Sequence, residues 1–185
     1  MVKLNMKSLL SIFLLLLSVL ASPGHAAETR FDSLYFFQSE SILKSKQIKP
    51  DEMARFSNKV QSQIWKALKK ASIPSTSGYL VIAVRSDGKV ATWLDMEPAL
   101  HEFYANEIVD AVKKIGPFSV DRGVVVFGIK MNIDTPKMFD FKRANEMPKF
   151  TTRAKPSPQE WQSVLKKVNN PDDIEEVVMA AWPEE

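Results

Sequence analysis

The sequence from residue 78 to residue 94 reads GYLVIAVRSDGKVATWL, two apolar runs on either side of Ser86-Asp87-Gly88. Aliphatic and β-branched residues dominate both runs, which is typical of β-strands. Glycine adopts positive φ angles at no steric cost and aspartate tolerates the left-handed region, so Asp-Gly favours a tight turn. The segment therefore predicts a β-hairpin.

A helix and a third strand follow the hairpin. Apolar residues recur at three- and four-residue spacing as far as Ile115, with Pro98 expected in the first turn and Gly116-Pro117 after the last. The segment Val124–Ile133 is then apolar almost throughout. We expect an α+β fold in which a small three-stranded antiparallel sheet, in the order β-β-α-β, is packed by helices.

The two-residue period of a strand assigns side chains to faces. In the first strand Leu80, Ile82 and Val84 share a face, and Tyr79, Val81 and Ala83 share the other. One face of the third strand is expected to hold Val125, Phe127, Ile129, Met131 and Ile133. A helix predicted from Pro50 to about Ser72, with an apolar stripe from Met53 to Leu68, can cover one side of this sheet.

The order of these elements, with the run AVKKIGPF at residues 111–118, resembles the C-terminal domain of the TolA and TonB envelope proteins. The resemblance extends over about residues 51–133. It implies a stand-alone domain of that shape, and it implies binding of an extended peptide by strand addition at a sheet edge.

Residues 1–26 have the pattern of an export signal. Lys3 and Lys7 precede an apolar run from Ser8 to Ala21, and small residues follow as far as Ala27. The apolar run is shorter than the about 20 residues that a membrane span needs, so cleavage after Ala26 or Ala27 is favoured over an uncleaved anchor. In a source with two membranes the mature protein would be periplasmic, and otherwise it would be secreted.

Composition excludes several classes of site. The chain has no cysteine, so it has no disulfide, thiolate nucleophile or zinc-thiolate centre. Loss of Lys3 and Lys7 with the signal leaves about 23 basic residues against 22 acidic ones. This near balance argues against a nucleic-acid partner, and stable membrane insertion after cleavage is not expected.

Two flanking segments have less regular patterns. In the lead-in, residues 27–50, the apolar part from Phe31 to Gln47 follows neither period, and a short helix or packed edge segment is favoured over a partner-binding peptide. In residues 134–156 basic residues alternate with aromatic ones. We interpret this segment as a linker held to the domain by its aromatic residues, with binding of single-stranded nucleic acid or an anionic polymer as the alternative.

The C-terminal extension, residues 157–185, is expected to form two helices. Ser157 and Glu160 have the spacing of a capping box before a helix predicted from Pro158 to about Val168. Asn170-Pro171-Asp172-Asp173 is predicted to start a second helix, with Ile174, Val177, Val178 and Ala181 on its inner side. We expect the two to dock through Trp161 and Trp182.

Little in the sequence indicates catalysis. His101 is the only histidine after the signal, no phosphate-binding glycine loop is present, and neither a metal nor a cofactor is predicted. Asp95 and Glu97 form the best candidate pair for a general acid and base, which would make the protein a hydrolase of envelope polymers. A protein-binding module that is not an enzyme is the leading hypothesis, and a structural accessory subunit of an envelope or secretion complex is a further alternative.

The third strand is predicted to lie at the sheet edge. Its backbone would then pair with an extended peptide of an envelope protein, with Val124, Val126, Gly128 and Lys130 as partner-binding residues. The strand is apolar on both faces, and an exposed edge of that kind invites aggregation. The segment after Ile133 is therefore expected to shield this edge or the adjacent sheet face, through Met138, Phe139 and Phe141 or through the terminal helices.

Overall fold

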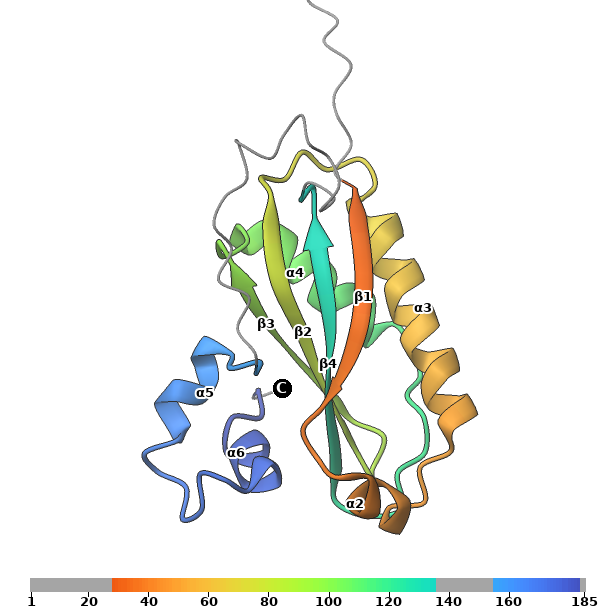
Figure 1. Cartoon of the computed structure of the whole chain (residues 1–185), viewed down its shortest axis with the longest axis vertical. Helices are drawn as coiled ribbons and strands as arrows, with labels where there is room; N and C mark the ends of the chain where they lie inside the picture. Colours follow the sequence, from red (N-terminus) through yellow and green to blue (C-terminus); the bar gives the residue numbers. More distant parts are fainter. Residues whose placement is uncertain (1–27, 136–154, 184–185) are drawn as a thin grey trace, which may run out of the picture.

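The computed structural model describes residues 28–135 and 155–183, so the predicted signal and Met138, Phe139 and Phe141 lie outside the described residues. Strands and helices follow one another in the order β1 (Thr29–Phe36), α2 (Glu40–Ser45), α3 (Pro50–Leu68), β2 (Thr76–Arg85), β3 (Val90–Glu97), α4 (Glu102–Lys113), β4 (Val124–Ile133), α5 (Gln159–Val164) and α6 (Ile174–Ala180) (Figure 1).

The strands form one antiparallel sheet in the order β1-β4-β2-β3. The predicted α+β class, the hairpin and the central place of its first strand are confirmed. The count of three strands is wrong, because the lead-in supplies a fourth, β1, which pairs with β4 from Thr29↔Ile133 to Phe36↔Phe127. Part of the apolar segment from Phe31 to Gln47 is thus an edge strand, and α2 follows it.

Each face of the sheet has its own layer of helices (Figure 1). On one face α3 and α4 pack against a cluster that includes Leu80, Ile82, Val84, Val125, Phe127, Ile129, Met131 and Ile133. On the other face α5 and α6 pack against Tyr79, Val81, Ala83, Trp93, Val124 and Val126. The division of faces expected from the strand period is therefore confirmed.

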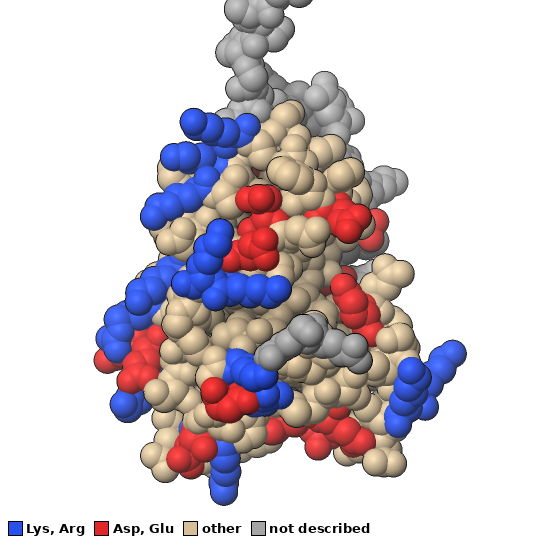
Figure 2. Space-filling model, turned by 180° about the vertical axis from the view of Figure 1, so that it is seen from behind, with Lys and Arg blue, Asp and Glu red and all other residues tan. Residues whose placement is uncertain are grey.

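Local interactions explain where the helices begin. Pro50 lies in the first turn of α3, whose outward face carries exposed Arg55, Lys59 and Lys66, and exposed Lys69 and Lys70 follow directly after the helix. Figure 2 shows lysine and arginine side chains gathered along this side of the molecule. Helix α4 begins at Glu102 and not near Pro98, because Nδ1 of the exposed His101 accepts the amide of Phe103 at 3.2 Å.

The two C-terminal helices are present but shorter than predicted. The capping box does not form, because the Ser157 amide donates to Oδ2 of Asp95 at 2.7 Å and α5 begins at Gln159. Helix α6 begins at Ile174, where Oδ1 of Asp173 accepts the amide of Glu175 at 2.9 Å. The N-cap Asp173 is the last residue of the segment Asn170–Asp173 in which the start was predicted.

Candidate functional site

The four predicted partner-binding residues lie on β4, which is an interior strand. Gly128 pairs with Tyr35 of β1 on one side and with Val81 of β2 on the other, and Lys130 pairs with Ser33 and Tyr79. The expectation that this strand forms a sheet edge is therefore wrong.

Beyond the end of β1, residues Phe37 and Gln38 continue to hydrogen-bond the backbone of β4. The Val126 amide donates to Oε1 of Gln38 at 2.9 Å, and Nε2 of Gln38 donates to the Val124 carbonyl at 2.7 Å. The amide of Phe37 donates to the Val126 carbonyl at 3.3 Å. A glutamine side chain thus provides the donor and acceptor that another strand residue would supply.

The segment after Ile133 was expected to shield either the edge of β4 or the adjacent face of the sheet. A different segment covers the edge, whereas the terminal helices cover the face as expected. The lead-in, through β1 and Gln38, covers the edge. The terminal helices cover the face, since Val177 and Val178 of α6 belong to the same cluster as Val124 and Val126. An incoming peptide would have to displace one of these before it reached β4.

Strands β1 and β3 form the outer edges of the sheet. The pairing of β1 with β4 shifts register between Phe31 and Ser33, and the exposed Asp32 lies at the shift. Bulges and charges of this kind protect an edge against pairing. The pairing of β3 with β2 is regular from Ser77↔Glu97 to Val84↔Val90. Of the two edge strands, β3 is therefore the more regular one for an added strand to pair with.

The hairpin turn decides which backbone groups of β3 point outward. The Arg85 amide donates to the Lys89 carbonyl at 2.9 Å, and Gly88, with φ 81°, donates to the Arg85 carbonyl at 2.9 Å. Hydrogen-bonded and non-hydrogen-bonded pairs alternate in an antiparallel ladder. The backbone groups of Ala91, Trp93, Asp95 and Glu97 accordingly point toward β2, whereas those of Val90, Thr92, Leu94 and Met96 point away from it. Within the described part of the chain no strand lies on that outer side.

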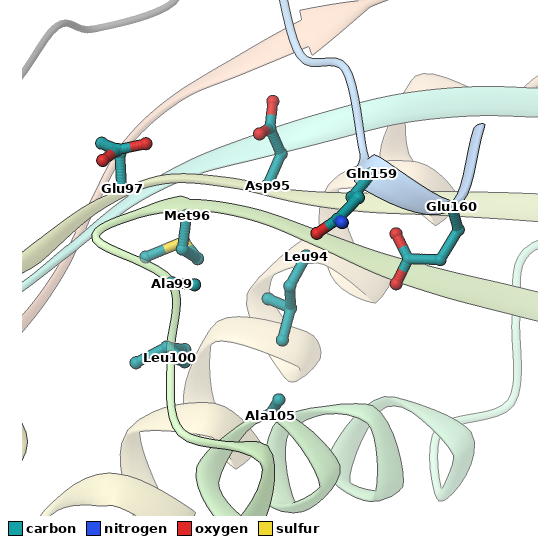
Figure 3. A pocket seen from close by; sticks show the side chains of 9 residues that line it. All are labelled: Leu94, Asp95, Met96, Glu97, Ala99, Leu100, Ala105, Gln159 and Glu160. Carbon is teal, nitrogen blue, oxygen red and sulfur yellow. The ribbon is translucent and has the colours of Figure 1, made fainter. Parts of the chain in front are cut away.

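A hollow of about 420 Å³ lies beside the second half of this edge, and Figure 3 shows its walls. Apolar side chains from β3 and from α4 with the loop before it lie on one side of the edge, namely Leu94, Met96, Ala99, Leu100 and Ala105. Polar side chains from β3 and α5 lie on the other, namely Asp95, Glu97, Gln159 and Glu160. The hollow thus runs around the edge of the sheet, between α4 and α5.

The two carboxylates proposed as an acid and base line this hollow. The Asp95 carboxylate holds the start of α5 through the Ser157 amide, and the side chain of Glu97 is exposed two residues further along β3. Among residues 28–135 and 155–183, no group of three or more histidine, cysteine, aspartate or glutamate side chains is placed to hold a metal ion. In the same residues, none of the helices has both the length and the apolar character needed to span a bilayer.

Sequence reasoning found Asp95 and Glu97 but missed the edge on which they lie. The turn chemistry at Asp87-Gly88 is sufficient to predict which amides of β3 point outward. That these amides face no further strand depends on the order of the whole sheet, and the approach of Gln159 and Glu160 depends on a contact far along the chain.

Comparisons of the chain with models of known protein families, with curated proteins and with solved structures found no match. Function is therefore inferred from the geometry of the β3 edge and from the sequence.

Proposed function

We propose that this chain is an exported cell-envelope protein that binds an extended segment of another envelope protein by adding it to the outer edge of β3. One observation carries the proposal: the outward backbone groups of Leu94 and Met96 border a hollow between α4 and α5. Main-chain hydrogen bonds give such complexes their affinity, and pockets for alternate side chains give them specificity.

Two features of the sequence support the same function. The TolA/TonB-like resemblance over residues 51–133 implies binding by strand addition, and this region includes the hairpin to which β3 belongs. The signal-like pattern of residues 1–26 supports export, and cleavage after Ala26 or Ala27 leaves all of β1 in the mature protein. The hydrolase alternative has less support, because the Asp95 carboxylate is engaged by the Ser157 amide.

The test removes one outward amide from β3. Proline at position 94 has no N–H to offer an incoming strand, and the pairing with β2 does not use the Leu94 amide, so an edge strand tolerates the change. The mature chain is first used to select binders from a displayed library of random linear peptides. We expect Leu94→Pro to abolish binding of the selected peptides, and Leu94→Ala, which keeps the amide, to weaken it only several-fold.

Thermal unfolding of both variants gives the control for folding. A folded Leu94→Pro variant that binds the selected peptides as tightly as the wild type would contradict the proposal. Failure to enrich any linear peptide above the level of an unrelated domain would contradict it as well.

A further inference from the structure

We infer that the segment bound at β3 alternates aliphatic side chains with lysine or arginine. This inference rests on the proposed function and adds the chemistry of the partner. A strand added to β3 continues the pleat of the sheet, so its successive side chains point to opposite faces. The two walls of the hollow differ in chemistry, and each therefore selects every second side chain of the ligand.

The wall on the α4 side is apolar. Leu94, Leu100 and Ala105 are partly buried there, and Met96 is 8% exposed. Methionine is unbranched and flexible, so it adapts to side chains of different shape. Aliphatic side chains of the ligand would move out of water when they pack against this wall, and burial of their apolar surface favours binding.

The wall on the α5 side is acidic. Asp95, Glu97 and Glu160 supply three carboxylates, and none of the described lining residues of the hollow is basic. Oδ2 of Asp95 accepts the Ser157 amide at 2.7 Å, which holds this carboxyl group near the edge. Lysine and arginine side chains would place their methylene stems along the edge and their charged ends among these carboxylates.

The distribution of charge over the rest of the molecule also favours binding of a basic segment at β3. The basic side chains gathered on α3 lie on the β1 side of the molecule, and β3 is at the opposite end of the sheet order (Figures 1 and 2). A basic segment is attracted to β3 and repelled from α3. Pairing of two β3 edges from two copies of this chain is disfavoured, because it would bring the acidic walls together.

The inference is tested with three synthetic peptides of equal length and the full mature chain. One alternates valine with lysine, the second valine with glutamate, and the third serine with lysine. We expect the valine–lysine peptide to bind most tightly, with the valine–glutamate peptide weaker by at least about tenfold at low salt. The difference in affinity between the valine–lysine and valine–glutamate peptides should shrink as salt is added. The weaker binding of the serine–lysine peptide should persist, because it comes from lost apolar contacts.

A double variant tests the acidic wall directly. Glu97→Gln with Glu160→Gln should reduce the preference for lysine over glutamate several-fold, and Glu107→Gln, an exposed position of α4 outside the hollow, should leave it unchanged. Equal binding of the valine–lysine and valine–glutamate peptides would overturn the inference. If a selected peptide still depended on the Leu94 amide, strand addition would stand and only the partner chemistry would be wrong. If no peptide depended on that amide, strand addition itself would be wrong.

Discussion

Lys46 is a buried ammonium group at the centre of a polar junction. Its side chain is 6% exposed, and its Nζ lies 2.8 Å from Oε1 of Glu175 and 3.3 Å from the Arg122 carbonyl. Glu175 also accepts from Nε2 of Gln38 at 3.3 Å and from the Val124 amide at 3.4 Å. These bonds join α6 to the end of α2 and to the first residue of β4.

Removal of the Glu175 carboxylate should leave the Lys46 charge buried without its counter-ion. Loss of one partner of a fully buried pair costs about 3–5 kcal/mol, and we expect about 2–3 kcal/mol for Glu175→Ala because this carboxylate is partly exposed. Denaturant titration measures the change. Glu40→Ala breaks the exposed Glu40–Lys44 pair and should cost under about 1 kcal/mol. Equal costs would contradict a structural role for the buried pair.

Asp87 gives the hairpin turn a dependence on pH. Hydrogen bonds from the Arg85 guanidinium are the main cause that lowers the pKa of Asp87 from 3.8 to about 2. A depressed pKa in the folded state stabilises the protein above the unfolded value, and this stabilisation is lost as pH falls from about 4 to about 2. Asp87→Asn should remove that part of the pH dependence in urea titrations. An unchanged profile would show that the ion pair does not affect folding.

The phase of β4 is tested by one core residue and one turn residue. Phe127 is fully buried, and its ring centroid lies 6.4 Å from that of Phe56 and 6.2 Å from that of Phe118. Phe127→Ala should cost about 3–5 kcal/mol, because it leaves a cavity between the sheet and α3. Lys89→Ala at the turn should cost under about 0.5 kcal/mol. Equal effects in denaturant titrations would contradict this placement of Phe127.

At the scale of elements, α5 and α6 are integral to the core. Trp161 of α5 is 4% exposed, and its ring centroid lies 5.4 Å from that of Phe37 and 5.6 Å from that of Trp93. Beyond α6, the Trp182 ring lies 4.8 Å from the Arg85 guanidinium. The two short helices therefore complete the second face of the sheet, and α5 alone of the two lines the β3 hollow.

Two tryptophans provide a matched test of this packing. Trp161→Ala should cost about 3–5 kcal/mol and expose apolar surface of the sheet, which sedimentation would detect as self-association. Trp65→Ala on α3 should cost under about 1 kcal/mol, because this side chain is 51% exposed and its ring lies under the ammonium group of Lys69 at the surface. A Trp161→Ala variant as stable as Trp65→Ala would show that α5 is dispensable for the core.

Local periodicity was sufficient to predict α3, β2, β3, α4 and β4, since each has a clear apolar pattern and distinct end signals. It was insufficient for β1. The register shift after Phe31 breaks the two-residue period, and Leu34 and Phe36 remain 38% and 40% exposed. The strand is held in place by its pairing with β4, a contact that its own sequence does not encode.

The same limit explains why the sequence predicted β4, and not β1 or β3, as the edge strand. Without β1, β4 would be an edge, and its apolar character predicts a segment that shields it. The shield is Gln38 and the strand before it, which reach β4 from 86 or more positions away in the chain. The β3 hollow likewise requires Ser157 to reach Asp95 across 62 positions.

At the scale of the whole molecule, two layers of helices cover the faces of the sheet, while α4 and α5 approach its β3 edge from opposite faces (Figures 1 and 3). Helix α3 carries basic side chains on the β1 side of the molecule, and acidic side chains line the β3 hollow. This distribution leaves β3 as the edge best suited to an extended basic partner.

Amide hydrogen exchange of the mature chain, followed residue by residue by NMR with and without a selected peptide, tests strand addition most directly. The amides of Thr92, Leu94 and Met96 point outward and should exchange more slowly in the complex. The amides of Ala91, Trp93 and Asp95 already pair with β2 and should change little. Alternating protection along β3 is the predicted result. A bound peptide that slows exchange along β1 instead, or that leaves Leu94 and Met96 unchanged, would contradict the account.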